Sequence, residues 1–157
     1  MPDLTISHDE LRPLVEDILR QEGRVRFTAR GQSMRPFIQD GDRVEVRALS
    51  SLSGGIKPGH VILCHQCGGR LVVHRVVRVL RSDRETRFEI QGDANWEPDG
   101  IVAFHQVLGQ VVSARSGSME RRFETFWQRL LGVCWIRWKP YHHKLCRAYH
   151  KLRQIGR

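Results

Sequence analysis

Between residues 24 and 115 the chain consists of short runs of β-branched and aromatic residues, separated by turns that contain glycine. Pairs such as Gly-Asp, Gly-Gly and Pro-Gly interrupt the runs at close intervals, and such pairs are typical of tight turns. Short, evenly spaced strands of this kind favour an antiparallel barrel or coiled sheet. The sequence therefore predicts a mainly β fold. The expected strands are Val25–Ala29, Arg43–Arg47, His60–Cys64, Leu71–Leu80, Thr86–Gln91 and Val107–Ala114.

Helical periodicity flanks the β region on both sides. Apolar residues recur at helical spacing from Leu11 to Leu19, and Gly23 supplies a stop, which predicts a short N-terminal helix. Beyond Ser116 two basic amphipathic helices rich in tryptophan are expected, one on each side of Pro140. We therefore divide the chain into an N-terminal amphipathic helix (1–23), a central β domain (24–115) and a basic aromatic helical tail (116–157).

The net charge of +9 comes entirely from residues 115–157. Residues 1–114 carry fifteen Lys and Arg against fifteen Asp and Glu, whereas residues 115–157 carry eleven against two. A neutral body with a basic end is typical of a folded domain with an electrostatic attachment device. The chain contains no apolar run of the length that a transmembrane helix needs, and its first residues do not resemble a signal peptide. The expected location is cytoplasmic.

The four cysteines do not follow the spacing of a structural zinc site. Cys64 and Cys67 form a CxxC pair, but Cys134 and Cys146 in the tail are separated by eleven intervening residues. We interpret them as four unrelated thiols, which agrees with a reducing compartment. The sequence implies no metal and no organic cofactor.

Residues 31–44 contain the sharpest chemical signal, a serine followed by methionine and, two positions later, proline. The hydroxyl of Ser33 is a weak nucleophile until a base removes its proton. Gly31 would permit a turn that presents the serine, and nearby backbone N–H groups could hold an oxyanion. Taken alone, the same residues also fit an ordinary turn before a strand.

A base and an acid follow downstream. Strand alternation places His74 on one face with Val72 and Val76, which fits either a catalytic base or a core histidine. Asp93 and Asp99 each neighbour a glycine, so each fits either a turn cap or an acid that orients the base.

In this order the three segments resemble the conserved boxes of the signal peptidase/LexA superfamily of serine peptidases. The first resembles the nucleophile box, Gly-x-Ser-Met-x-Pro followed by Gly-Asp. His74-Arg75-Val76 resembles the histidine version of the base box, which the endoplasmic-reticulum type and its bacterial relatives carry in place of lysine. The segment from Phe88 to Gly100 resembles the third box, Lys-Gly-Asp-Asn-Asn…Asp-Asp.

The resemblance implies a nucleophile at Ser33, a base at His74 and an orienting acid at Asp99. Asp93, Gly31 and Met34 are the implied supporting residues. It also implies a coiled-sheet fold and substrates that enter as extended strands with small residues near the cleaved bond.

The chain departs from the family pattern in three places. A helix stands where the family has a membrane anchor, His60 stands where an aspartate is usual, and Gly31 stands where some members have an oxyanion-stabilising serine. A second Ser-Met pair at Ser118 lacks the following proline and comes after the histidine. We therefore do not assign Ser118 as the nucleophile.

The predicted function is a serine endopeptidase acting on a peptide or precursor protein, with residues 24–115 as the peptidase domain. One alternative is a self-cleaving regulator of the LexA kind, for which Cys67-Gly68 is a candidate scissile pair. Another is a catalytically inactive module whose basic tail binds nucleic acid or an anionic membrane. For residues 119–153 we expect a peripheral anionic membrane partner and not nucleic acid, because cationic side chains surround the aromatic rings there. The same aromatic stripe also fits packing against the β domain, and the sequence leaves these two interpretations open.

Overall fold

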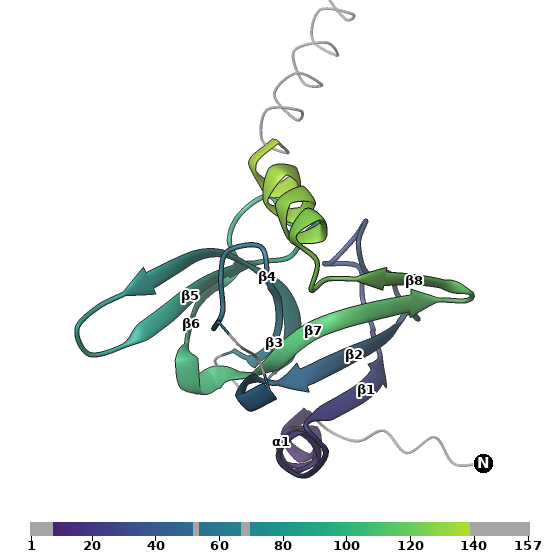
Figure 1. Ribbon diagram of the computed structural model, residues 1–157, viewed down its shortest axis with the longest axis horizontal. Helices are drawn as coiled ribbons and strands as arrows, with labels where there is room; N and C mark the ends of the chain where they lie inside the picture. Colours follow the sequence, from purple (N-terminus) through teal and green to yellow (C-terminus); the bar gives the residue numbers. More distant parts are fainter. Residues whose placement is uncertain (1–7, 52–53, 67–69, 139–157) are drawn as a thin grey trace, which may run out of the picture.

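The computed structural model describes residues 8–51, 54–66 and 70–138, and its centre is one strongly curved antiparallel sheet (Figure 1). Cys67-Gly68 and the predicted second tail helix lie outside these residues. The strands are β1 (Arg24–Thr28), β2 (Arg43–Ala48), β3 (Val61–His65), β4 (Leu71–Arg81), β5 (Thr86–Gln91), β6 (Gly100–Ala103), β7 (Val107–Ser116) and β8 (Met119–Arg122). Helix α1 (His8–Glu22) precedes them, and two short 3-10 turns follow β2 and β6 (Leu49–Ser51 and Phe104–Gln106).

The sheet has the strand order β1-β2-β7-β3-β4-β5-β6, with β8 paired to the outer part of β7. Every pairing is antiparallel. Among the described residues the end strands β1 and β6 each pair with one neighbour, so the sheet is open. The prediction of a mainly β, antiparallel coiled sheet is confirmed, and the sheet does not close into a barrel.

Two apolar cores lie along the curved sheet. The first lies beneath α1, where alternate residues of β2 and β7 meet the helix; it includes Val15, Leu19, Val44, Val46 and Val111. The second fills the fold of β3, β4 and β5 around Ile62, Val76, Phe88 and Ile90. Period-two alternation along the strands explains both, because every second side chain faces inward.

The N-terminal helix agrees closely with its prediction. Val15 and Leu19 are buried one turn apart on the face toward the sheet. Gly23 has a φ of +70°, and its amide donates to the carbonyl of Leu19 at 3.1 Å. Glycine adopts this left-handed conformation without steric penalty, which explains why the helix ends there.

Two strands were not expected from the sequence. Met119–Arg122 forms β8 on a turn at Gly117, so the sheet continues past residue 115, where the sequence pattern ended it. Its residues are polar and largely exposed, so no alternation revealed the strand. Strand β6 begins at Gly100, directly after Asp99, which the sequence presented as a possible turn cap.

The described part of the C-terminal helix covers residues 126–138 and projects from one end of the sheet (Figure 1). It matches the first of the two helices predicted for the tail. Within the described ranges, no helix combines the length and apolar character required to cross a bilayer.

Candidate active site

The Ser33 turn is a closed loop between β1 and β2. Backbone hydrogen bonds between Ala29 and Asp42 and between Gly41 and Ala29 close its base. Met34 and Ile38, which are 4% and 2% exposed, anchor the loop in the first core. Met34 thus packs the loop in place while Ser33, one residue earlier, is left partly exposed at the surface.

Gly31 supplies the bend before the serine. Its φ of +95° lies in the left-handed region, which favours glycine. Its amide donates to the Asp40 carboxylate at 2.8 Å, so this N–H group is already occupied. Gly31 therefore shapes the turn.

His74 faces the serine from β4. The strand pairs His74 with Ile62 of β3, and only 6% of the histidine is exposed. Nε2 of His74 lies 3.3 Å from Oγ of Ser33, within hydrogen-bonding distance. These two residues are 41 positions apart in the chain, and the fold brings together the two functional groups that the sequence singled out.

Asp99 lies on the other side of the imidazole, immediately before β6. Its Oδ2 is 3.3 Å from Nδ1 of His74, and that nitrogen is buried without a well-aligned hydrogen bond. Oδ2 accepts the Gly92 amide and Oδ1 accepts the Asn95 side-chain amide, each at 2.6 Å. The carboxylate is thus held in place beside the imidazole. Catalytic hydrogen bonds are often long or poorly aligned in the absence of substrate.

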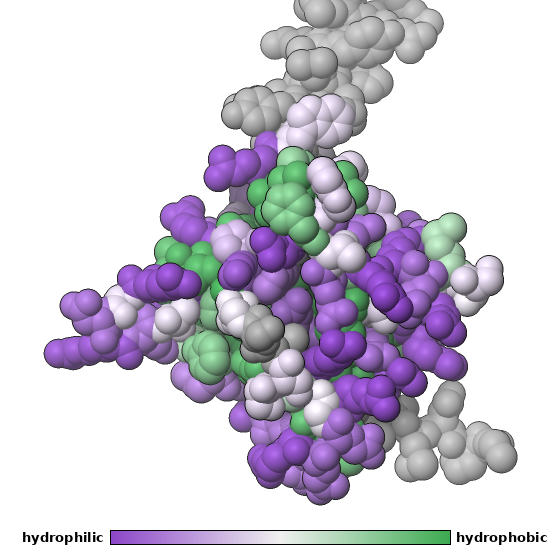
Figure 2. All heavy atoms as spheres, in the orientation of Figure 1, coloured by the Kyte–Doolittle hydropathy of each residue, from purple (hydrophilic) through white to green (hydrophobic). Residues whose placement is uncertain are grey.

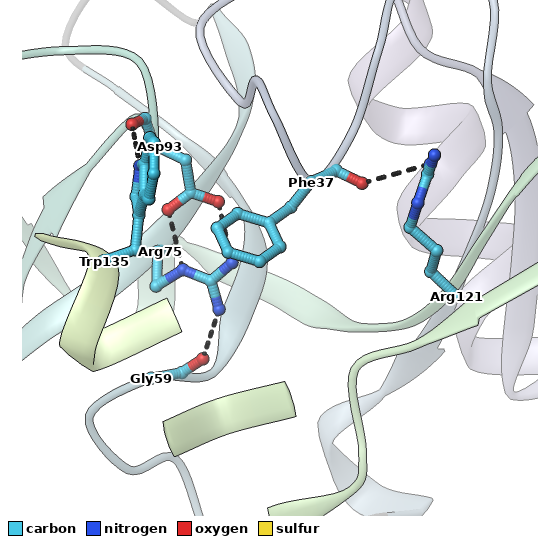
Figure 3. A network of polar contacts seen from close by, with 6 residues as sticks. All are labelled: Phe37, Gly59, Arg75, Asp93, Arg121 and Trp135. Atoms are coloured by element: carbon cyan, nitrogen blue, oxygen red, sulfur yellow. Dashed lines mark hydrogen bonds and ion pairs between the residues drawn. The ribbon is translucent and has the colours of Figure 1, made fainter. Parts of the chain in front are cut away.

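Asp93 has a different environment. Both of its carboxylate oxygens accept from the guanidinium of Arg75 at 2.7 Å, and both side chains are almost completely buried (Figure 3). The sequence left open whether Asp93 or Asp99 faces the histidine. In the structure the Asp99 carboxylate faces Nδ1 of His74, and the Asp93 carboxylate binds the Arg75 guanidinium.

The electrostatic setting favours a neutral imidazole at His74. Burial lowers the pKa of His74 below its usual value of 6.5, while the carboxylates of Asp99 and Asp93 act in the opposite direction and Arg70 adds to the lowering. At neutral pH the ring is therefore uncharged. With Nδ1 protonated toward Asp99, Nε2 is free to accept the proton of the Ser33 hydroxyl.

This shift predicts the acid limb of the pH profile. If His74 is the base that accepts the proton of Ser33, only its neutral form is active, so kcat/KM should rise with pH and reach its plateau through an apparent pKa below 6.5. The measurement is peptide hydrolysis between mildly acidic and alkaline pH at low substrate concentration. A limb centred above 6.5 would contradict a desolvated histidine base.

A cavity of about 620 Å³ opens over these groups. Ser33, His74 and Asp99 line it together with Phe27 and Thr28 of β1, the following Ala29, and Leu71–Val73 of β4. In the described sheet β1 pairs only with β2, and β4 pairs with β5 only from Arg75 onward. Two strand edges with free backbone groups therefore border the cavity, and an extended peptide can pair with such edges.

Other sequence candidates lie apart from this site. Ser118 is exposed in the turn between β7 and β8 and is not among the residues that line the cavity. Cys64 is buried on β3, and burial raises the pKa of its thiol to about 12. Across the described segments, no three His, Cys, Asp or Glu side chains converge as metal ligands.

The sequence did not indicate the roles of two residues near the site. Arg75 was noted only as part of a family box, although an arginine in the middle of a buried strand signals a buried acidic partner. For Trp135 the sequence left open membrane attachment and packing on the β domain. In the structure its indole N–H donates to the backbone carbonyl of Asp93 at 2.8 Å.

The fold and the site define an open antiparallel β protein with a serine–histidine pair backed by a carboxylate. Signal peptidase IB of Staphylococcus aureus, in strains Mu50, N315 and MW2, is 36% identical to this chain over 53 residues. The matched segment is 34% of this chain and 28% of each of these relatives, so the chain spans little more than a quarter of their length. No protein-family model matches the chain. The partial match supports a relationship to the signal peptidases.

Proposed function

We propose that this protein is a serine endopeptidase in which Ser33 is the nucleophile, His74 the general base and Asp99 the acid that orients it. The observation that carries the proposal is the line of three side chains, with 3.3 Å from Ser33 Oγ to His74 Nε2 and 3.3 Å from His74 Nδ1 to Asp99 Oδ2. The partial match to signal peptidase IB supports the same reaction class.

The proposed reaction follows from these positions. Ser33 Oγ attacks the peptide carbonyl carbon while His74 Nε2 takes the hydroxyl proton, and Asp99 stabilises the imidazolium that forms. The C–N bond then breaks, and His74 returns the proton to the leaving amine, which leaves an ester on Ser33. A water molecule, deprotonated by His74, hydrolyses the ester and releases the acid product.

The oxyanion that forms on the carbonyl needs hydrogen-bond donors. The Gly31 amide already donates to Asp40. The backbone N–H of Ser33 itself is the donor that we propose on this turn.

The substrate is proposed to be an extended segment of a peptide or precursor protein. The free edges of β1 and β4 on either side of the cavity offer backbone hydrogen bonds to such a segment. The resemblance to signal peptidases adds an expected preference for small residues beside the cleaved bond.

Covalent capture of Ser33 tests the proposal directly. A fluorophosphonate should label the full-length protein once, with the adduct on the tryptic peptide that contains Ser33. The Ser118→Ala variant should be labelled like the wild type, and the Ser33→Ala variant not at all. Labelling that survives Ser33→Ala, or a wild-type protein that stays unlabelled, contradicts the assignment.

The outer face of the C-terminal helix supports a second, separate proposal: attachment to an anionic membrane surface. Large apolar side chains gather on this helix among hydrophilic neighbours (Figure 2). The exposed ones are Phe126, Trp127, Leu130, Leu131 and Trp138. The surplus of basic residues lies in the same part of the chain, and an amphipathic helix with these features binds lipid headgroups. Each basic residue near an anionic membrane contributes about 1 kcal/mol.

Co-sedimentation with vesicles checks this attachment. At low salt the full-length protein should bind vesicles that contain phosphatidylserine, bind neutral vesicles weakly, and dissociate as salt is raised. A variant with Trp127→Ser and Leu131→Ser should lose most of the binding, because both side chains are more than half exposed and contribute little to the fold. Equal binding by the variant would refute membrane attachment. So would a protein that binds RNA but does not bind anionic vesicles at low salt.

A further inference from the structure

The C-terminal helix docks closely against the body of the protein. A Cβ atom at Gly59 would lie 2.9 Å from the Arg129 backbone carbonyl, and one at Gly132 would overlap the Arg75 guanidinium. Nη1 of Arg129 lies 3.4 Å from Nε2 of His60, and burial lowers the pKa of His60 to about 4. His60 is therefore neutral and has one acceptor nitrogen, so it accepts either from Arg129 at Nε2 or from the Lys57 amide, which lies 3.3 Å from Nδ1. Glycine on each surface allows the close approach.

Trp135 of the helix and three side chains of the body form a cluster, which we call the Arg75 cluster: Phe37, Arg75, Asp93 and Trp135 (Figure 3). The Arg75 guanidinium lies 5.0 Å from the centre of the Phe37 ring and donates to the Gly59 carbonyl at 2.8 Å. The ring of Trp135 meets Phe37 edge to face, with centroids 6.2 Å apart. Its N–H donates to the Asp93 carbonyl.

The first three members of the Arg75 cluster lie on the segments that carry the proposed catalytic residues. Phe37 belongs to the Ser33 loop, and Arg75 directly follows His74 on β4. Asp93 begins the loop that ends at Asp99. Trp135, from the helix, contacts the first and last of these segments and completes the cluster.

The loop from Gly92 to Asp99 is also bonded directly to the nucleophile's backbone. The Ala94 amide donates to the Ser33 carbonyl at 2.7 Å. A Cβ at Gly92 would lie 2.7 Å from that same carbonyl, and the Gly92 amide donates to Asp99. A shift of this loop would therefore move Ser33 and Asp99 relative to His74 on β4.

We infer that Trp135 is a positioning residue and that the C-terminal helix completes the active site by fixing the 92–99 loop against the Ser33 loop. This inference rests on the proposed function for its catalytic consequence. It also changes the role expected of the tail, because the inner face of the helix then supports the site while the outer face stays exposed.

The test compares Trp135→Phe with Cys134→Ser in the full-length protein. Trp135→Phe keeps an aromatic ring and removes the donor to Asp93, whereas the neighbouring Cys134 is exposed on the same helix and serves as the matched control. Backbone hydrogen exchange, measured by NMR, should be about tenfold faster at the Ala94 amide in Trp135→Phe, the scale of one lost hydrogen bond. The amides of Val46 and Val111 in the first core should exchange at the wild-type rate in both variants.

The catalytic readout is separate. The rate constant kcat for peptide hydrolysis should fall about tenfold in Trp135→Phe with KM unchanged, and should stay at the wild-type value in Cys134→Ser. Unchanged Ala94 exchange in Trp135→Phe, or faster exchange at Ala94, Val46 and Val111 alike, overturns the positioning role. If exchange responds as expected but the wild type neither labels nor hydrolyses peptide, the helix still positions the loop and the proposed peptidase function fails.

Discussion

Ser33→Ala and His74→Ala should each abolish peptide hydrolysis, with kcat falling by a factor on the order of 10⁶ in either case. The alanine at 33 has no atom to attack the carbonyl. The alanine at 74 leaves the hydroxyl protonated and therefore a weak nucleophile. Because Nε2 and Oγ face each other at 3.3 Å and act as a unit, the double variant should be no slower than either single one. Initial rates on a peptide library, followed by mass spectrometry, measure this.

Ser118→Ala is the matched control for the nucleophile. Ser118 also precedes a methionine, but it lies in the exposed turn between β7 and β8, so its loss should leave kcat and KM unchanged. Ser33→Ala should unfold at nearly the wild-type temperature, because Ser33 is only partly buried on its turn. Activity retained by Ser33→Ala and lost by Ser118→Ala would reverse the assignment.

The sheet could be predicted from the sequence because its signals are local. Alternation along β2, for example, places Val44 and Val46 inward, and the glycines mark where the strands end. Strand β8 escaped prediction because Met119–Arg122 is a polar edge strand, whose only structural requirement is pairing with β7. Its burial is too slight to leave a pattern in the sequence.

The candidate site was predictable to the extent that short motifs carry it. The motif around Ser33 and the His-Arg-Val run singled out Ser33 and His74, whose side chains lie 3.3 Å apart in the structure. Local pattern could not separate Asp93 from Asp99, because both adjoin glycine and differ only in what the folded chain brings to them. Asp93 pairs with the Arg75 guanidinium, and Asp99 faces the His74 imidazole.

The role of Trp135 could not be predicted from local sequence either, because its partner lies far away in the chain. Its spacing with Trp127 and Trp138 fits an amphipathic helix in solution, on a membrane or against a sheet. The contact with Asp93 joins residues 42 positions apart and depends on the absence of a side chain at Gly132. The sequence showed the amphipathic pattern but could not show which face of the helix the protein itself covers.

Asp99→Asn and Asp93→Asn should separate the two acids by opposite effects. In Asp99→Asn, kcat should fall by about 10²- to 10⁴-fold, because a neutral amide neither fixes the imidazole tautomer nor stabilises the imidazolium. Asp99 raises the pKa of His74, so removing its charge should also move the acid limb of kcat/KM to lower pH. The free energy of unfolding should change by only about 1 kcal/mol, since the asparagine keeps an oxygen as an acceptor and the side chain is 22% exposed.

Asp93→Asn should act on stability. The Arg75 and Asp93 side chains are 1% and 0% exposed, so the variant leaves a buried guanidinium without its counter-charge, which costs about 3–5 kcal/mol. Urea unfolding followed by tryptophan fluorescence, with hydrolysis measured well below the transition, distinguishes the two results. A stable, inactive Asp93→Asn beside an active Asp99→Asn would exchange the roles of the two acids. Equal loss of stability in both variants would show that Asp99, like Asp93, serves the fold and that His74 works without an orienting acid.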